Sequence, residues 1–520
     1  MIDKFINNRF FIIFLFPFIL GSLSVLSFQP FNIIFINFLI FPILFYSVIF
    51  INKKSKVTYR KKPYKKNLFL FGLLFGFGFY FSGLSWITNS LTFDQNFKIL
   101  IPFALILIPL FLSLFMAFTI LFFGPFLQLN FPSIFFFSAS LSLSDYLRAK
   151  LLTGFPWNMW AYSSVWITEF LQILNFIGLH SFNLLLVTIF TYPIIFFFKI
   201  NTIKKTVYFF SLVFLILILN IFGNYEINKN KKRLESIDQS AYVKVISPNF
   251  DLKYGLNEAQ IEKKIKKLIK ISDPDKKKKT LFIWPEGVFS GYSYDEIIKF
   301  RNLIKQNFSR EHSIVFGINT FDPDSGRYFN SMLIVDNNFN IIKSYNKRKL
   351  VPFGEFLPLE NFLNKLGLKK ITEGHGSFLK GKNNNNLIID KLNILPMICY
   401  EVIFTDFIQQ SSASTNLIIN ISEDAWFGKS IGPDQHFAKS IFRAVEHNTF
   451  LIRSANKGVS AIIDNKGNII KQLNRNEVGN IEYEVPLIKS NKVKNDLIFF
   501  MLLITYLFIF QIYKEKNAKK

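Results

Sequence analysis

The run from Ile99 to Leu127 reads ILIPFALILIPLFLSLFMAFTILFFGPFL and contains no charged side chain. An apolar run of about 18 or more residues is long enough to cross a bilayer as a helix. Comparable runs cover residues 10–28, 31–51, 68–91, 131–146, 170–198, 207–222 and 497–513. They predict a polytopic α-helical membrane bundle of about eight spans, with seven in residues 1–224 and the last at 497–513.

Two of these runs have alternative interpretations. Residues 10–28 could be a signal peptide, but the length of the run and the lack of a small-residue cleavage site favour an uncleaved helix. The run at 131–146 is short and could be re-entrant.

The composition excludes several classes of protein. Half of the 520 residues are hydrophobic, 67 are Phe and one is Cys, which excludes a soluble cytosolic enzyme, a disordered chain and a disulfide scaffold. The net charge of +26 indicates either an anionic partner or a general enrichment in lysine, and we favour the second. No aromatic RNA-binding signature lies among the lysines, so we expect no nucleic-acid partner.

The basic loops predict the orientation. Lysine and arginine cluster at residues 53–66, at 199–205 and in the tail at 514–520, whereas residues 92–96 carry neither. Positive loops lie in the cytoplasm, and alternating spans bring all of these clusters to one side. We therefore expect segment 224–495 to lie on the extracytoplasmic side of the membrane.

Residues 241–486 have a different pattern, in which short β-rich runs alternate with amphipathic helical ones. The helix face Ile261, Ile265, Leu268 and Ile269 is one example. The pattern predicts an α/β layered domain. The expected strands cover 242–246, 281–284, 313–318, 331–335, 394–399, 417–421, 450–454 and 460–463.

Three residues in this domain are candidates for covalent chemistry. Cys399, the single cysteine, follows an apolar strand; it is either a nucleophile or a small buried hydrophobe. Glu286 follows Phe282-Ile283-Trp284-Pro285, where a carboxylate can act as the base or cap a helix. Lys347 can stabilise an oxyanion, although most lysines are solvated surface residues.

The motifs around these residues resemble those of a known protein superfamily. Trp284-Pro285-Glu286, Lys347 with its Leu-Val-Pro-Phe-Gly-Glu tail, and Cys399-Tyr400-Glu401 resemble the Glu-Lys-Cys triad of the nitrilase superfamily. Nearly the whole chain is similar to the apolipoprotein N-acyltransferases, the membrane-embedded branch of that superfamily. Further matches are Gly154-Phe155-Pro156-Trp157 and Asp424-Ala425-Trp426-Phe427-Gly428, followed by Gln435-His436, Arg443, Glu446, Arg453, Ser454 and Asn456.

The resemblance implies a fold and roles for single residues. The fold would be an α-β-β-α nitrilase-like sandwich on a bundle of eight spans. Glu286 would be the general base, Cys399 the nucleophile and Lys347 the cation that holds the thiolate and the oxyanion. Glu355 would orient Lys347. Tyr400, Glu401 and Trp426 would support the site or line its pocket.

The implied substrates are a phospholipid acyl donor, with phosphatidylethanolamine preferred, and the N-terminal diacylated cysteine of a bacterial apolipoprotein. No metal or nucleotide cofactor is indicated. The chain departs from the family at Glu423, where Asn is usual, and at Tyr254, where Trp is frequent. Both departures could alter substrate gating.

An apolar arm at 356–368, beside Lys365, Lys369 and Lys370, either enters the lipid interface or packs as an ordinary core helix. Three rival functions remain: a membrane-tethered amidase that resolves a thioester with water, a non-catalytic scaffold, and a transporter. The outer Gly-Phe-Pro-Trp loop favours acyl transfer, the intact triad disfavours the scaffold, and the few charges within the spans disfavour a transporter.

Overall fold

The computed structural model describes residues 8–57, 64–358, 360, 376–382, 386–490 and 495–518. Leu359 and residues 361–368 of the predicted apolar arm lie outside this described part. The chain divides into two compact units, residues 1–226 with 493–520 and residues 227–492. Each unit is described by itself.

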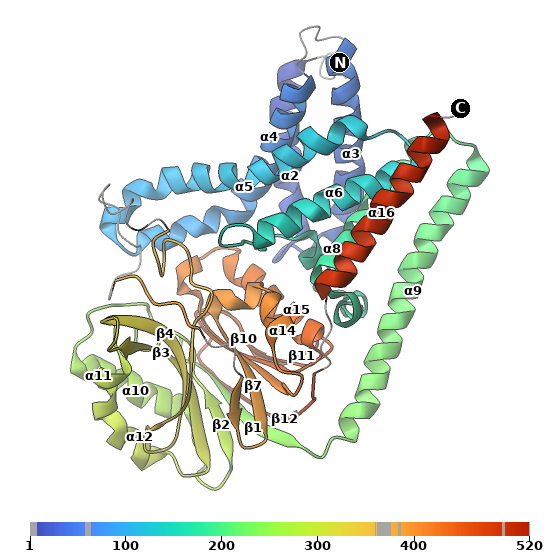
Figure 1. The fold of residues 1–520 in the computed structure, drawn as a ribbon. Coiled ribbons are helices and arrows are strands. Elements are labelled where there is room, and N and C mark those ends of the chain that lie inside the picture. The colour runs from blue at the N-terminus through green and yellow to red at the C-terminus, as the bar shows by residue number, and fades with distance from the viewer. Residues whose placement is uncertain are drawn as a thin grey trace. The chain divides into compact units, whose positions relative to one another are not determined.

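The first unit is helical (Figure 1). Six helical stretches in the described residues are long and apolar enough to cross a membrane: 34–56, 64–92, 95–126, 174–197, 202–235 and 496–516. The main helices are α2 (Phe16–Ser24), α3 (Asn37–Val57), α4 (Tyr64–Leu84), α5 (Ile101–Phe123), α6 (Phe131–Lys150), α8 (Leu174–Thr191), α9 (Thr202–Glu235) and α16 (Asn495–Ala518). The apolar helical run Phe11–Ser27 is shorter, and α6 is not among the six, so the count of about eight spans stays a prediction.

Small residues allow the helices of this unit to approach closely. A Cβ added to Gly72 of α4 would lie 2.9 Å from the Cα of Ala117 on α5. A Cβ on Gly78 would lie 2.1 Å from the carbonyl oxygen of Phe18 on α2. Helices in lipid gain stability from such close packing, because the hydrophobic effect does not drive their association there.

A buried polar cluster joins α6 to α8. The Arg148 guanidinium lies 2.9 Å from Asp145 Oδ1, and Asn183 Nδ2 donates to Asp145 Oδ2 at 3.0 Å. Arg148 also donates to the carbonyl oxygen of Phe155, in the predicted outer loop. The cluster therefore fixes the start of that loop against α6 while it pairs the buried charges.

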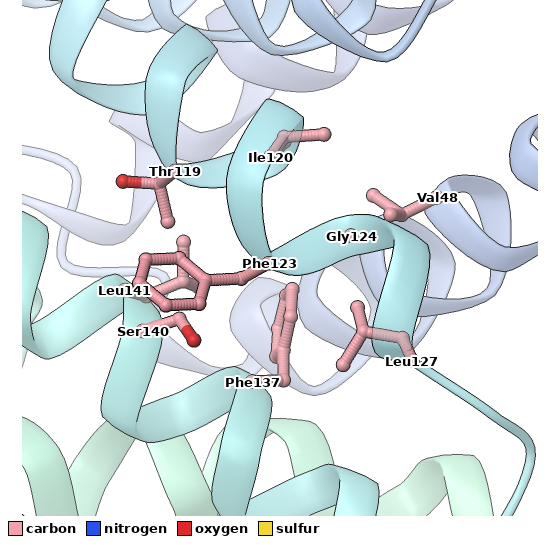
Figure 2. A pocket seen from close by; sticks show the side chains of 9 residues that line it. All are labelled: Val48, Thr119, Ile120, Phe123, Gly124, Leu127, Phe137, Ser140 and Leu141. Carbon is pink, nitrogen blue, oxygen red and sulfur yellow. The ribbon is translucent and has the colours of Figure 1, made fainter. Parts of the chain in front are cut away.

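A small apolar pocket lies between α3, α5 and α6 (Figure 2). Its two hydroxyl groups, on Thr119 and Ser140, donate to carbonyl oxygens within their own helices. Its empty space of about 220 Å³ is below the range of about 300–1,000 Å³ that is usual for ligand sites. We assign it no ligand. Its lining is Val48, Thr119, Ile120, Phe123, Gly124, Leu127, Phe137, Ser140 and Leu141.

The second unit contains two six-stranded sheets (Figure 1). The first has the order β12-β1-β2-β3-β4-β5, and the second has the order β11-β10-β9-β8-β7-β6. The first comprises β1 (Ser240–Ser247), β2 (Thr280–Ile283), β3 (His312–Asp322), β4 (Arg327–Val335), β5 (Ile341–Asn346) and β12 (Gly479–Pro486). The second comprises β6 (Leu387–Ile389), β7 (Leu392–Ile398), β8 (Leu417–Glu423), β9 (Leu451–Asn456), β10 (Ser460–Ile463) and β11 (Ile469–Leu473).

Helices cover the outer face of each sheet, and the two sheets contact each other. The apolar face of α10 (Glu258–Ser272) packs with Phe282 of β2 and with Trp284 directly after that strand, as its spacing predicts. On the second sheet, Ser440 of α15 (Gly432–His447) donates to Asn420 of β8 at 3.4 Å. The Ser454 hydroxyl of β9 donates to the carbonyl of Ile246 on β1 at 2.8 Å, which joins the sheets. The expected α/β nitrilase-like layering is thereby confirmed.

All eight expected strands are present. β5, β6, β11 and β12 were not expected. β5 and β11 expose four residues in succession, so they lack the apolar run or alternation that predicts a strand. β5, β6, β11 and β12 are also the edge strands of the two sheets, which are often polar.

Candidate active site

The three candidate reactive residues each follow a strand. Glu286 lies in the turn after β2, Lys347 directly follows β5, and Cys399 directly follows β7 and begins the short 3-10 helix η10 (Cys399–Ile403). Glu286 therefore does not cap a helix. Lys347 is 1% exposed, which excludes a solvated surface residue.

A buried cluster of two carboxylates, one ammonium and one amide connects two of these strand ends. Lys347 Nζ lies 2.8 Å from Glu355 Oε1 and 3.7 Å from Glu286 Oε1. Asn330 Nδ2, on β4, donates to the same two oxygen atoms, at 2.8 Å each. The amide and the ammonium thus hold both carboxylates in fixed positions.

The Lys347 ammonium stays charged in this environment. Burial lowers its pKa, but the negative charges of Glu355 and Glu286 outweigh burial and raise the pKa above its ordinary value. The backbone of Lys347 is also held on both sides, because its N–H donates to Asn330 O and its carbonyl accepts from Gly381 N, at 2.8 Å each. A fixed, desolvated cation of this kind is suited to stabilise developing negative charge.

The position of Glu286 depends on close packing at two glycines, Gly317 and Gly287. A Cβ on Gly317 of β3 would lie 2.9 Å from Glu286 Cα. Gly287 has a φ of +75°, and a Cβ there would lie 2.3 Å from Glu423 Oε2. The N–H of Glu423 donates to Glu286 Oε2 at 3.0 Å. Both carboxylate oxygens of Glu286 therefore have fixed partners, since Asn330 donates to the other.

Cys399 is a buried thiol in a strained backbone conformation. Its φ of +47° lies in the left-handed region, which non-glycine residues seldom adopt. Burial and the negative charge of Glu286 raise the pKa of the thiol above its ordinary value, and the Lys347 ammonium offsets this only in part. The resting sulfur is therefore a neutral thiol, which needs a base before it can attack.

Glu401 joins the cysteine to the lysine through the backbone. Its Oε2 accepts the N–H of Ile398 at 2.8 Å, and its Oε1 accepts the N–H of Arg348 at 2.7 Å and the hydroxyl of Tyr345 at 2.8 Å. The side chain is fully buried. Its carboxylate therefore ties the start of η10 to the loop that carries Lys347.

The other predicted supporting residues differ in exposure. Tyr400 is buried and stacks edge-to-face on Phe404, with ring centroids 5.1 Å apart. Tyr254 is half-buried; a Cβ on Gly291 would lie 3.2 Å from its ring. Trp426 is half-buried on the short helix η11 (Asp424–Phe427). Their roles stay predictions.

The departure at Glu423 puts an additional carboxylic acid beside Glu286. Glu423 is 2% exposed, and Asn456 Nδ2 donates to its Oε2 at 2.8 Å. Burial raises the pKa of Glu423 to about 8, although Asn456 and the N–H of Ala425 act in the opposite direction. At neutral pH this acid is mainly uncharged and resembles the amide that it replaces.

Asn330 is the residue that sequence reasoning missed. It is a buried polar residue in β4, and an isolated amide next to an apolar run is a feature that can indicate a buried polar contact. Its partners come from loops that follow two other strands, so only the fold reveals the contact.

The described site combines a buried thiol, carboxylates and a fixed cation, which are residue types that suit acyl chemistry on a thiol. The chain also matches two family models. Residues 250–494 match the family model "Carbon-nitrogen hydrolase", and residues 20–192 match "Apolipoprotein N-acyltransferase N-terminal domain".

Curated relatives match along most of the chain. "Apolipoprotein N-acyltransferase" of Brucella melitensis is 30% identical over 90% of this chain and 89% of its own length. The protein of that name in Rickettsia typhi is 32% identical over 80% of this chain and 83% of its own. The chain belongs to the apolipoprotein N-acyltransferase family.

Two solved structures are similar to part of the chain. Nit3 of Saccharomyces cerevisiae, a nitrilase-superfamily member, is 16% identical, with a TM-score of 0.35, and covers 48% of this chain and 91% of its own. An amidase mutant of Nesterenkonia is 14% identical, with a TM-score of 0.33, and covers 48% and 93%.

Proposed function

We propose that the protein transfers an acyl chain from a phospholipid to the N-terminal amine of a diacylated apolipoprotein, through a thioester on Cys399. Family membership supports this proposal at the level of the reaction. The observation that carries it is the buried cluster of Glu286, Lys347, Glu355 and Asn330 beside a neutral thiol.

In the first half-reaction, Glu286 takes the proton of the Cys399 thiol as the sulfur attacks the ester carbonyl of the phospholipid. The carbonyl oxygen becomes an oxyanion, which the Lys347 ammonium stabilises. The intermediate then expels the lysophospholipid alkoxide, which receives the proton from Glu286. The enzyme is left with a thioester and an unprotonated Glu286.

In the second half-reaction, the amine of the apolipoprotein attacks the thioester carbonyl. Glu286 accepts a proton from the amine nitrogen, and the sulfur departs and recovers that proton. The product is an amide, and the thiol is regenerated. Because a thioester is higher in energy than an amide, the enzyme mainly has to exclude water until the amine binds.

Within this proposal, phosphatidylethanolamine is the preferred acyl donor.

We also propose that the protein is a multi-pass protein of the bacterial inner membrane, with its second unit in the periplasm. The basic clusters at 53–66 and 199–205 support this orientation. Alkaline phosphatase is active only outside the cytoplasm. Fused after residue 237 it should be active, and fused after residue 518 it should be inactive. The reverse pattern would contradict the orientation.

The function is tested with purified protein in phosphatidylethanolamine vesicles and a synthetic diacylated lipopeptide that begins with cysteine. Mass spectrometry should show that the lipopeptide gains one acyl chain while lysophospholipid forms in equal amount. A lipopeptide with an acetylated N-terminus is the matched control and should stay unchanged. Release of free fatty acid with no acylated peptide would favour the amidase, and no reaction at all would favour the scaffold.

A further inference from the structure

The backbone of Cys399 needs a partner that holds it. A left-handed conformation at a non-glycine residue is strained and persists only where the surroundings fix it. The φ of +47° occurs at the residue that carries the sulfur. Any relaxation of this conformation would redirect the sulfur, so the contact that prevents it matters for the reaction.

His436 of α15 makes that contact. Its ring is fully buried, and its Nε2 lies 3.2 Å from the carbonyl oxygen of Cys399. A carbonyl oxygen only accepts hydrogen bonds, so Nε2 carries the proton and donates it. Burial lowers the pKa of His436, and the neighbouring Asp424 carboxylate acts in the opposite direction.

The other ring nitrogen is also fixed. His436 Nδ1 lies 3.1 Å from Arg453 Nη2 and 3.0 Å from Asp424 Oδ1. The same Arg453 nitrogen donates to Asp424 Oδ2 at 2.8 Å, and the Ser422 hydroxyl donates to Asp424 Oδ1 at 2.6 Å. Residues from β8, β9 and η11 thus hold the imidazole in one orientation.

We propose that His436 is a positioning residue that holds the carbonyl of Cys399 and thereby keeps the nucleophile in its reactive conformation. The peptide after Cys399 is planar and trans, so its carbonyl and the N–H of Tyr400 point in opposite directions. Fixing the carbonyl therefore fixes the whole peptide group next to the reacting sulfur. The expected effect on acyl transfer rests on the proposed function. The expected effect on the position of the Cys399 sulfur does not.

Two substitutions of His436 distinguish the role of Nε2 from the role of Nδ1. In His436→Gln the amide nitrogen lies near the position of Nε2 and can still donate to Cys399. In His436→Asn the shorter side chain reaches only the position of Nδ1, so it keeps a polar group facing Arg453 and Asp424 but loses the donor to Cys399. His447→Asn, at the other buried histidine of the same helix, is the matched control.

Cys399 is the single cysteine, so alkylation by iodoacetamide reports on it alone by intact mass. We expect His436→Gln and His447→Asn to be alkylated within about threefold of the wild-type rate. We expect His436→Asn to be slower by at least about tenfold, since small misplacements of a reacting group have effects of up to about 100-fold. Acylation by phospholipid should follow the same order.

Equal losses in His436→Gln and His436→Asn, or a wild-type rate in His436→Asn, would overturn the proposal. Should His436→Asn yield no folded protein, His436→Leu replaces it, with the same expectation, because it has similar volume and no donor. If the wild-type protein is alkylated but never acylated, the proposed function fails while the alkylation rates still decide the role of His436.

Discussion

Lys347 Nζ is bonded to Glu355 Oε1 at 2.8 Å, and both side chains are buried. The second carboxylate, Glu286, is farther from the ammonium, at 3.7 Å. Glu355 is therefore the nearer partner of the lysine, and the ammonium holds Glu286 less closely. This division of roles between two similar carboxylates leads to the first prediction.

Glu355→Gln should slow acyl-enzyme formation by about 10–100-fold, the range found when a supporting partner of a functional group is removed. Without the Glu355 charge, the ammonium shifts its pairing to Glu286 and weakens it as a base. The rate is followed by intact mass after addition of phospholipid vesicles. Glu360→Gln, at an exposed glutamate that accepts from Ser377, is the control and should act like wild type. A wild-type rate in Glu355→Gln would contradict this role.

Gly287→Ala should abolish most activity. Both Gly287 and Gly326 have positive φ, so an alanine at either position costs about 1–2 kcal/mol of backbone strain. Only at Gly287 would the new Cβ meet another group, Glu423 Oε2 at 2.3 Å, whereas nothing lies within 4 Å at Gly326. Lipopeptide acylation and the apparent melting temperature are compared for the two variants. Equal activities would show that the clash does not displace Glu286.

Glu423→Gln should change how stability depends on pH. With a folded-state pKa of about 8 against an ordinary value of 4.5, the folded protein holds a proton that the unfolded chain releases. Stability should therefore fall as pH rises from 4.5 to 8, by up to about 1.4 kcal/mol per pH unit from this group. In detergent, Glu423→Gln should melt higher than wild type at pH 8 and similarly at pH 4.5.

The control for that comparison is Glu262→Gln, at a surface glutamate paired with Lys266. It should leave the pH profile of the melting temperature unchanged. If wild type and Glu423→Gln lose stability in parallel between pH 4.5 and pH 8, Glu423 is ionised in the folded protein at neutral pH.

Arg148→Leu should destabilise the helical unit strongly, because it leaves the Asp145 carboxylate buried without its cation. Breaking a buried ion pair from one side costs about 3–5 kcal/mol. The double variant Asp145→Leu with Arg148→Leu removes both charges and should melt higher than Arg148→Leu alone. A double variant that melts lower than the single one would indicate that the hydrogen bond from Asn183 to Asp145 stabilises the unit more than the unpaired carboxylate destabilises it.

The sequence is sufficient to predict the α/β domain and to indicate three candidate reactive residues in it. Glu286, Lys347 and Cys399 each follow a strand, and strand ends of one layered domain lie close in space. The eight predicted strands are short apolar runs, which are recognisable without a structure. The exposed edge strands β5 and β11 carry no such signal.

The rest depends on contacts between distant segments. Asn330 bridges Glu286 and Glu355, which are 44 and 25 residues away along the chain. His436 contacts a backbone carbonyl, and any residue type has one, so no residue pattern predicts that contact. The sequence shows that Glu423 departs from the family, but its burial beside Glu286 follows only from the packing of β8 against the turn after β2.

The central claim is that Cys399 carries the acyl chain, and one measurement tests it most directly. Wild type, Cys399→Ser and Glu286→Gln are incubated with phosphatidylethanolamine vesicles without acceptor, and their intact masses are measured. We predict a fatty-acyl mass on wild type that neutral hydroxylamine releases, with far less on either variant. An unmodified wild-type protein with intact phospholipid, or an equal adduct on Cys399→Ser, would contradict the account.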